Sequence, residues 1–203
     1  MKMKKTIAVT TGILLIGATI SFAGSDVKGT VSNKALINKS ANVSLGRGAE
    51  ANIGSVKVKN SNIKGTVSNR ALVNKSANVA LGRGAKANMG SVSVANSNIK
   101  GTVSNKALVN KSANVALGRG SKANMGSVDV KNSNIKGTVS NKALVNKSAN
   151  VALGRGATAN MGSVQVKNSN IKGTVSNRSL VNKSANVALG KGAKANMGSV
   201  VVE

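Results

Sequence analysis

The sequence lacks most of the side chains with which proteins do chemistry. It has no histidine, cysteine, tryptophan or tyrosine, and Phe22 is its one aromatic residue. It has four acidic residues: Asp26, Glu50, Asp129 and Glu203. No two of them occupy the same position of the tandem repeat that is described below. General acid–base catalysis needs a poised histidine, carboxylate, lysine or tyrosine, and zinc and calcium need clustered nitrogen, sulfur or oxygen ligands. We therefore expect a protein that is not an enzyme and that holds no metal ion or other cofactor.

What the sequence has instead is positive charge and aliphatic residues. Its 203 residues include 30 lysines and arginines, the formal net charge is +26, and 40% of the residues are apolar. That apolar content is too high for a typical charged disordered chain. Because aromatic side chains are missing as core material, we expect a regular structure with an aliphatic core.

The first 23 residues have the pattern of a signal peptide. Lys2, Lys4 and Lys5 form a positive segment, residues 7–20 are mostly apolar, and residues 21–23 (Ser-Phe-Ala) place small residues at a cleavage site. This pattern predicts Sec-type export with cleavage near Ala23. We expect a secreted or cell-surface protein, with the periplasm as a further location. No later stretch is apolar enough to predict a transmembrane segment.

The rest of the chain consists of tandem repeats. Glycines recur every 36 residues, and each begins a near-copy of the same segment: Gly29, Gly65, Gly101, Gly137 and Gly173. Residues 24–203 therefore divide into five repeats: 24–59, 60–95, 96–131, 132–167 and 168–203. A fixed period of this length is typical of a solenoid, in which each unit packs only against its neighbours.

Alternating apolar residues predict strands rather than helices. Three runs alternate in the third repeat: Ile99, Gly101 and Val103; Ala113, Val115 and Leu117; Val128 and Val130. Four turn clusters accompany them: Ser104-Asn105, Asn110-Lys111-Ser112, Gly118-Arg119-Gly120 and Lys131-Asn132-Ser133. Such runs indicate half-buried strands, and glycine and asparagine suit tight corners. The sequence therefore predicts an all-β fold, a parallel β-solenoid (β-helix).

The length of one coil is open to two interpretations. Val67, Val73 and Val79 are spaced by six residues, which partly matches a hexapeptide β-helix. We therefore expect two coils of about 18 residues in each repeat. A single coil of 36 residues is the alternative.

Stacked repeats place identical residues in columns. One asparagine column is expected to form a structural ladder of hydrogen bonds: Asn38, Asn74, Asn110, Asn146 and Asn182. A second column is Asn42, Asn78, Asn114, Asn150 and Asn186. Contact with a glycan or another ligand is the alternative role for these amides.

Cations form columns too, and we expect two of them to bind polyanions. The first is Lys39, Lys75, Lys111, Lys147 and Lys183, and the second is Arg47, Arg83, Arg119, Arg155 and Lys191. Two further columns begin at Lys28 and Lys34. Stacked like charges repel unless water or a polyanion compensates them. Candidate partners are lipopolysaccharide, acidic polysaccharide and extracellular DNA, whereas a solvated, solubilising surface is the alternative. Sequence-tolerant binding of single strands normally adds aromatic stacking platforms, which residues 24–203 lack. We therefore expect no dedicated nucleic-acid reader and no sequence-specific nucleic-acid partner.

Two motifs carry a resemblance to known families. The segments 113–118 (Ala-Asn-Val-Ala-Leu-Gly) and 123–128 (Ala-Asn-Met-Gly-Ser-Val) resemble the head repeats of trimeric autotransporter adhesins. The plan of a signal peptide followed by strand–turn repeats is similar to curlin-type fibre subunits. Both resemblances imply an extracellular structural or adhesive role.

These observations predict a secreted structural or adhesive protein of the bacterial surface or matrix. Because both ends of residues 24–203 match the 36-residue period, we also expect molecules to associate head-to-tail into filaments. A soluble cationic module that binds polyanions is the main alternative. An ice-binding solenoid is a third, which a single regular threonine in each repeat disfavours (Thr30, Thr66, Thr102, Thr138 and Thr174).

Overall fold

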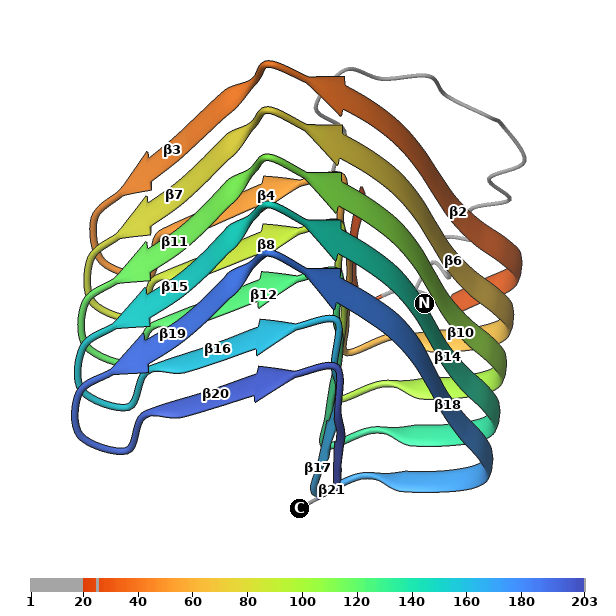
Figure 1. Cartoon of the computed structure of the whole chain (residues 1–203). Coiled ribbons are helices and arrows are strands. Elements are labelled where there is room, and N and C mark those ends of the chain that lie inside the picture. The colour runs from red at the N-terminus through yellow and green to blue at the C-terminus, as the bar shows by residue number, and fades with distance from the viewer. Residues whose placement is uncertain (1–19, 25, 203) are drawn as a thin grey trace.

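Each repeat forms one complete coil of a parallel β-solenoid (Figure 1). The structure, a computed structural model, describes residues 20–24 and 26–202, which contain 21 β-strands and no helix. Strands of successive coils pair in parallel with an offset of 36 residues, as Val103 pairs with Val139. The predicted all-β parallel solenoid of five repeats is therefore confirmed.

The expectation of two coils per repeat is wrong. No strand among the described residues pairs with an offset near 18. Every pairing joins residues 36 apart, including the pairing of β1 with β5. The six-residue spacing that suggested a shorter coil has another origin. Val67 and Val73 are buried on the same face of one long strand, while Val79 lies beyond a corner and faces outward.

The longest strands bend to form one large wall of the solenoid, the long sheet. Its strands are β2 (Asp26–Asn38), β6 (Asn62–Asn74), β10 (Asn98–Asn110), β14 (Asn134–Asn146) and β18 (Asn170–Asn182). Each strand passes through a glycine of positive φ, 139° at Gly101. A Cβ atom at Gly101 would lie 1.9 Å from the carbonyl oxygen of Gly65, so only glycine fits where these strands stack.

Three sheets of short strands complete each coil. The β3 sheet contains β3 (Ala41–Leu45), β7 (Ala77–Leu81), β11 (Ala113–Leu117), β15 (Ala149–Leu153) and β19 (Ala185–Leu189). The β4 sheet contains β4 (Glu50–Ile53), β8 (Lys86–Met89), β12 (Lys122–Met125), β16 (Thr158–Met161) and β20 (Lys194–Met197). The β5 sheet contains β1 (Ile20–Ala23), β5 (Val56–Lys59), β9 (Val92–Ala95), β13 (Val128–Lys131), β17 (Val164–Lys167) and β21 (Val200–Val202).

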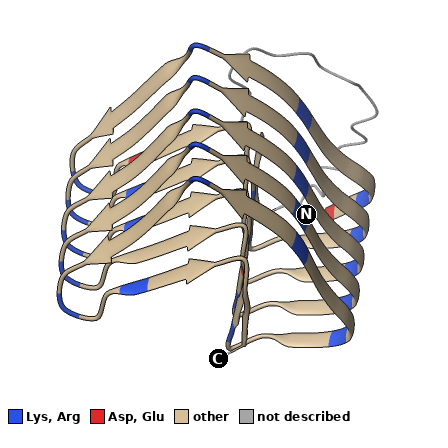
Figure 2. Ribbon diagram, viewed as in Figure 1, with Lys and Arg blue, Asp and Glu red and all other residues tan. Residues whose placement is uncertain are grey.

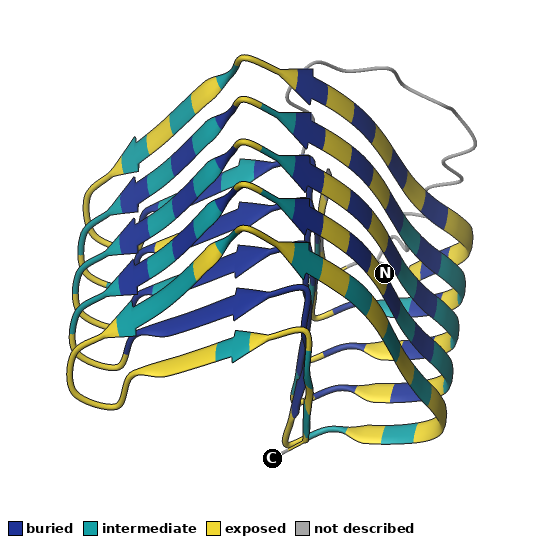
Figure 3. Cartoon of the chain, viewed as in Figure 1, coloured by how far each residue is buried: buried dark blue, intermediate teal, exposed yellow. Residues whose placement is uncertain are grey.

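The coil encloses two lobes (Figure 3), and the residues of their cores differ. In the valine lobe, between the long sheet and the β5 sheet, valine and isoleucine are buried, including Val103, Ile99 and Val130. In the alanine lobe, between the β3 and β4 sheets, the apolar core consists of alanines, including Ala87, Ala116 and Ala123. Where the lobes meet, a third cluster of alanine, isoleucine, valine and methionine is buried, and Met125 is one of its members.

Strand β1 extends the β5 sheet beyond the repeats. It pairs in parallel with β5, Ile20 opposite Val56, and so keeps the 36-residue offset of the coils. Residues 1–19 of the predicted signal peptide lie outside the described residues, and residues 20–23 of it form β1. In the described part of the chain, no helix is long and apolar enough to cross a membrane.

Two local expectations need correction. The predicted turn at Ser104-Asn105 lies inside β10, because the Asn105 amide is buried and bonds to asparagines in the coils on either side. The alternation in residues 113–117 does mark a strand, β11, but the buried residues are Asn114 and Ala116. Val115 and Leu117 face outward instead, against the usual rule that the more apolar residues of an alternating strand are buried.

Candidate functional site

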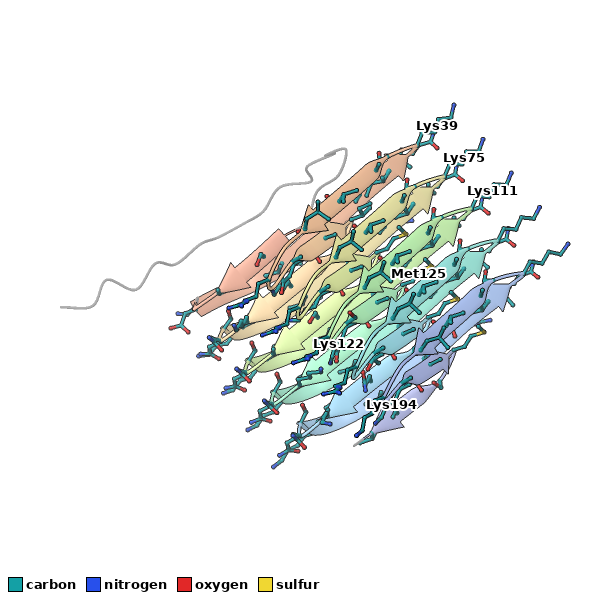
Figure 4. The ribbon with its side chains drawn as sticks, turned by 90° about the vertical axis from the view of Figure 1, so that its left-hand side faces the viewer. Lys39, Lys75, Lys111, Lys122, Met125 and Lys194 are labelled. Atoms are coloured by element: carbon teal, nitrogen blue, oxygen red, sulfur yellow. The ribbon has the colours of Figure 1, made fainter. Side chains whose placement is uncertain are left out.

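The first predicted cation column lies at the corner between the long sheet and the β3 sheet, and we call it the apex ladder. It consists of Lys39, Lys75, Lys111, Lys147 and Lys183, all exposed. Each of the first four lysines donates its backbone N–H to an asparagine carbonyl of the next coil, as Lys75 does to Asn110 at 3.0 Å. Figure 4 shows the side chains of Lys39, Lys75 and Lys111 pointing away from the solenoid. The backbone therefore holds these cations in line along one edge.

All five lysines of the apex ladder have a left-handed backbone, with φ between 46° and 51°. This conformation costs most residues about 1–2 kcal/mol, whereas asparagine tolerates it. The corner that follows the β5 sheet has the same backbone but carries asparagine: Asn60, Asn96, Asn132 and Asn168. The apex ladder thus keeps lysine at a position where the backbone favours a different residue.

The second predicted column lies at the far end of the alanine lobe, and we call it the tip ladder. It consists of Arg47, Arg83, Arg119, Arg155 and Lys191, all exposed, each between two glycines. The glycine before Arg83 has a φ of 137°, and a Cβ there would lie 1.9 Å from the carbonyl oxygen of Gly46. The glycines let the loops stack closely, so the arginines also form a column one strand spacing apart, about 4.8 Å.

Two more cation columns run along the outer face of the long sheet (Figure 2). They consist of Lys28, Lys64, Lys100, Lys136 and Lys172, and of Lys34, Arg70, Lys106, Lys142 and Arg178, all exposed. Beside the second of these runs a column of exposed leucines (Leu36, Leu72, Leu108, Leu144, Leu180). The column that begins at Lys34 and the column of leucines together line a groove of about 830 Å³.

Acidic side chains neutralise few of these charges. The described residues contain two acids with ion pairs: Glu50 contacts Lys57 and Lys86, and Lys131 lies 3.8 Å from Asp129. Burial acts to raise the pKa of Glu50, but hydrogen bonds and charges from Lys57 and Lys86 outweigh it and lower that pKa. None of these pairs involves the apex or tip ladder, so the charge of both ladders is left for solvent or a partner.

Asp129 behaves in the opposite way to Glu50. Its side chain is buried between β13 and the β4 sheet, and burial raises its pKa despite the opposing charges of Lys122 and Lys86. Its Oδ1 atom has no hydrogen-bond partner. The described residues contain no group of three acidic, histidine or cysteine side chains that could hold a metal ion.

The asparagine columns form hydrogen-bonded ladders. In the predicted structural ladder, each amide donates to the asparagine of the preceding coil, as Asn110 does to Asn74 at 3.0 Å; the other rungs are Asn74 to Asn38, Asn146 to Asn110 and Asn182 to Asn146. The second predicted column is more deeply buried. Asn114 donates to Asn150 at 2.8 Å and also to two backbone carbonyl oxygens, those of Ala87 and Asn124. The amides of the second column therefore satisfy one another inside the fold, and those of the first column do so at its surface.

Sequence reasoning missed two further asparagine ladders. One contains Asn33, Asn69, Asn105, Asn141 and Asn177, and the other contains Asn52, Asn88, Asn124, Asn160 and Asn196. A signal for the first was present, since Asn105 lies two residues from both Val103 and Ala107 and shares their inward face. An asparagine in phase with core positions and repeated every 36 residues predicts a buried ladder.

Fold and site together define the class of this protein. It is a parallel β-solenoid of five 36-residue coils whose outer surface carries lysine and arginine in columns. Comparisons with protein-family models, with curated proteins and with solved structures gave no match.

Proposed function

We propose that this protein is an exported structural or adhesive solenoid that binds polyanions through the apex and tip ladders. The observation that carries the proposal is the left-handed backbone of all five apex lysines. Residues held in unfavourable backbone conformations are often kept for function, and asparagine occupies the equivalent conformation at the other corner. The ammonium groups, rather than the backbone, therefore account for lysine at this position.

Electrostatics supports the same conclusion. The backbones of neighbouring residues in each ladder are about one strand spacing apart, about 4.8 Å, which is well within the Debye length of about 8 Å at physiological ionic strength. The ladders have no acidic partners among the described residues. A polyanion such as acidic polysaccharide, lipopolysaccharide or DNA would relieve this repulsion and release counterions. The resemblance to adhesin head repeats supports a location at the cell surface.

The test replaces three apex lysines with the residue that suits the backbone. In Lys75→Asn, Lys111→Asn, Lys147→Asn we expect unchanged or higher stability, because asparagine tolerates the left-handed conformation. Heparin affinity should fall at least tenfold, and the slope of log affinity against log salt should fall by about two to three.

The matched control removes three charges elsewhere, in Lys64→Gln, Lys100→Gln, Lys136→Gln on the long sheet. It should lose clearly less heparin affinity than the apex variant. Equal losses would mean that binding follows net charge alone, and absence of salt-dependent binding by the parent protein would contradict the proposal.

Assembly into filaments is a second candidate function, which strand β1 favours. Its pairing means that the outer edge of β5 accepts an extended segment from outside the repeats. Cleavage near Ala23 would remove β1 and leave that edge for β21 of another molecule, and such a heterologous contact does not close. Electron microscopy of residues 24–203 at moderate salt should show filaments. Monomers at high concentration under those conditions would contradict head-to-tail assembly.

A further inference from the structure

The outer surface of the β3 sheet is apolar, although it faces solvent. The residues that point outward from each of its strands are alanine, valine and leucine, represented in β11 by Ala113, Val115 and Leu117. We call this surface the apolar face. At its two ends the exposed fractions are large, 69% for Leu45 and 59% for Leu189. In the central coils the stacked neighbours cover part of each side chain.

The apolar face is where the usual burial pattern is reversed. Asn114 and Ala116 are buried on the inner side of β11, and the larger apolar side chains point outward. Sequences break local rules mainly at functional sites, and a contiguous exposed apolar patch marks an interaction surface. Five strands of five residues make this patch about 13 Å along the strands and about 19 Å across them.

Cations border the apolar face on both sides. The apex ladder precedes each strand of the β3 sheet and the tip ladder follows it, two residues away in both directions, as Lys111 and Arg119 do for β11. The segment between the two ladders contains no acidic residue in any of the five repeats. An apolar centre with basic borders is complementary to a surface that offers hydrocarbon beneath anionic groups.

We propose that the apolar face docks onto the surface of a lipid membrane rich in anionic headgroups. Valine and leucine enter the boundary between headgroups and acyl chains, while the two ladders contact lipid phosphates, with long lysine and arginine stems that let the charges remain in water. This inference rests on the proposed function of the ladders. It identifies the polyanion that they bind as the phosphate groups of a lipid surface. A second copy of the chain is a poorer occupant, because two such faces in contact would bring like-charged ladders together.

The test compares two sets of leucine substitutions in the full chain. Leu81→Ser, Leu117→Ser, Leu153→Ser changes the apolar face, and Leu72→Ser, Leu108→Ser, Leu144→Ser changes the exposed leucines of the long sheet in the same three coils. The probe is co-sedimentation with vesicles of phosphatidylglycerol and phosphatidylcholine, and with vesicles of phosphatidylcholine alone.

We expect the parent protein to bind the anionic vesicles at least tenfold more tightly than the neutral ones. The face variant should lose at least tenfold in vesicle affinity and keep its heparin affinity, whereas the long-sheet variant should keep both. If the serine variant fails to fold, a milder variant that preserves β-branching takes its place: Val79→Thr, Val115→Thr, Val151→Thr. This variant should also bind the anionic vesicles more weakly than the parent protein.

Four results separate the alternatives. Vesicle binding that survives in a folded face variant overturns the membrane proposal, and so does a parent that binds heparin but not anionic vesicles. A dimer in sedimentation analysis that the face variant dissociates would assign the face to a second copy instead. A parent that binds neither heparin nor vesicles refutes the proposed function of the ladders as well.

Discussion

The two lobes of the solenoid are built from the same coil but are stabilised in different ways. The valine lobe buries branched aliphatic side chains such as Ile99 and Val103 at 0% exposure. The alanine lobe buries methyl groups such as that of Ala116, and beside them a column of amides that includes Asn114, also at 0%. Burial of a valine or isoleucine contributes about 1.5–3 kcal/mol, against about 0.8 kcal/mol for a single methylene. The alanine lobe therefore depends more on satisfied hydrogen bonds than on apolar area.

This difference also accounts for the apolar surface of the alanine lobe. Its interior accommodates alanine and a buried asparagine, so the larger residues of β11 lie on the outside. In the valine lobe the outward positions of the long sheet carry mostly polar or charged residues, including Lys100, Thr102 and Lys106. The surfaces of the two lobes thus differ because their interiors differ.

The largest expected effect is in the valine lobe. Ile99→Ala removes a side chain that is 0% exposed and stacked between Ile63 and Ile135. We expect the free energy of unfolding to fall by about 2–5 kcal/mol, from lost burial and a residual cavity. Chemical denaturation followed by circular dichroism measures this. A loss below about 1 kcal/mol would mean that the valine lobe collapses around the cavity, and that close packing of its side chains does not stabilise the lobe.

A smaller loss is expected when the amide ladder of the alanine lobe is broken. Asn114→Ala removes an amide NH₂ whose two hydrogens are shared among three buried acceptors, and it removes the acceptor for Asn78. Leaving buried polar groups unpaired should cost about 1–3 kcal/mol. The control is Asn110→Ala, which breaks a half-exposed ladder where water replaces the partner, so its cost should stay below about 1 kcal/mol. Equal costs would contradict the special role of amides in the alanine lobe.

Sequence patterns could predict the repeat, the fold class and three of the four turn clusters, because these depend on local alternation and corner residues. They failed where the deciding contacts join distant residues. Asn114 is buried because of carbonyl groups 27 and 10 residues away, at Ala87 and Asn124. The ladder through Asn105 likewise needs neighbours 36 residues away on both sides. The cation columns followed from the period alone, but their left-handed backbone and the apolar face between them required the structure.

The smallest expected effect lies at the seam between the lobes, where Asp129 faces the β4 sheet. In the next coil the same position holds Gln165, whose Oε1 accepts a hydrogen bond from Asn160 at 3.1 Å. Asp129 has an unpartnered Oδ1 instead, and Asn124 occupies the position equivalent to Asn160. Asp129→Gln should therefore stabilise the protein at neutral pH by about 1 kcal/mol, because it removes a buried charge and supplies the acceptor found in the neighbouring coil.

The pH dependence of this gain separates charge from hydrogen bonding. Burial raises the pKa of Asp129 in the folded state, so the folded protein binds this proton more tightly than the unfolded chain does. The Asp129 contribution to stability therefore falls as the pH rises above about 4, the ordinary aspartate value, until the folded carboxyl has also ionised. The advantage of Asp129→Gln should grow over the same interval in denaturation measured from pH 3 to 7. Asp129→Asn, the control that removes only the charge, should show the same growth with a smaller gain at each pH. An advantage independent of pH would mean that the carboxyl is solvated, and that the seam between the lobes is more open than its burial indicates.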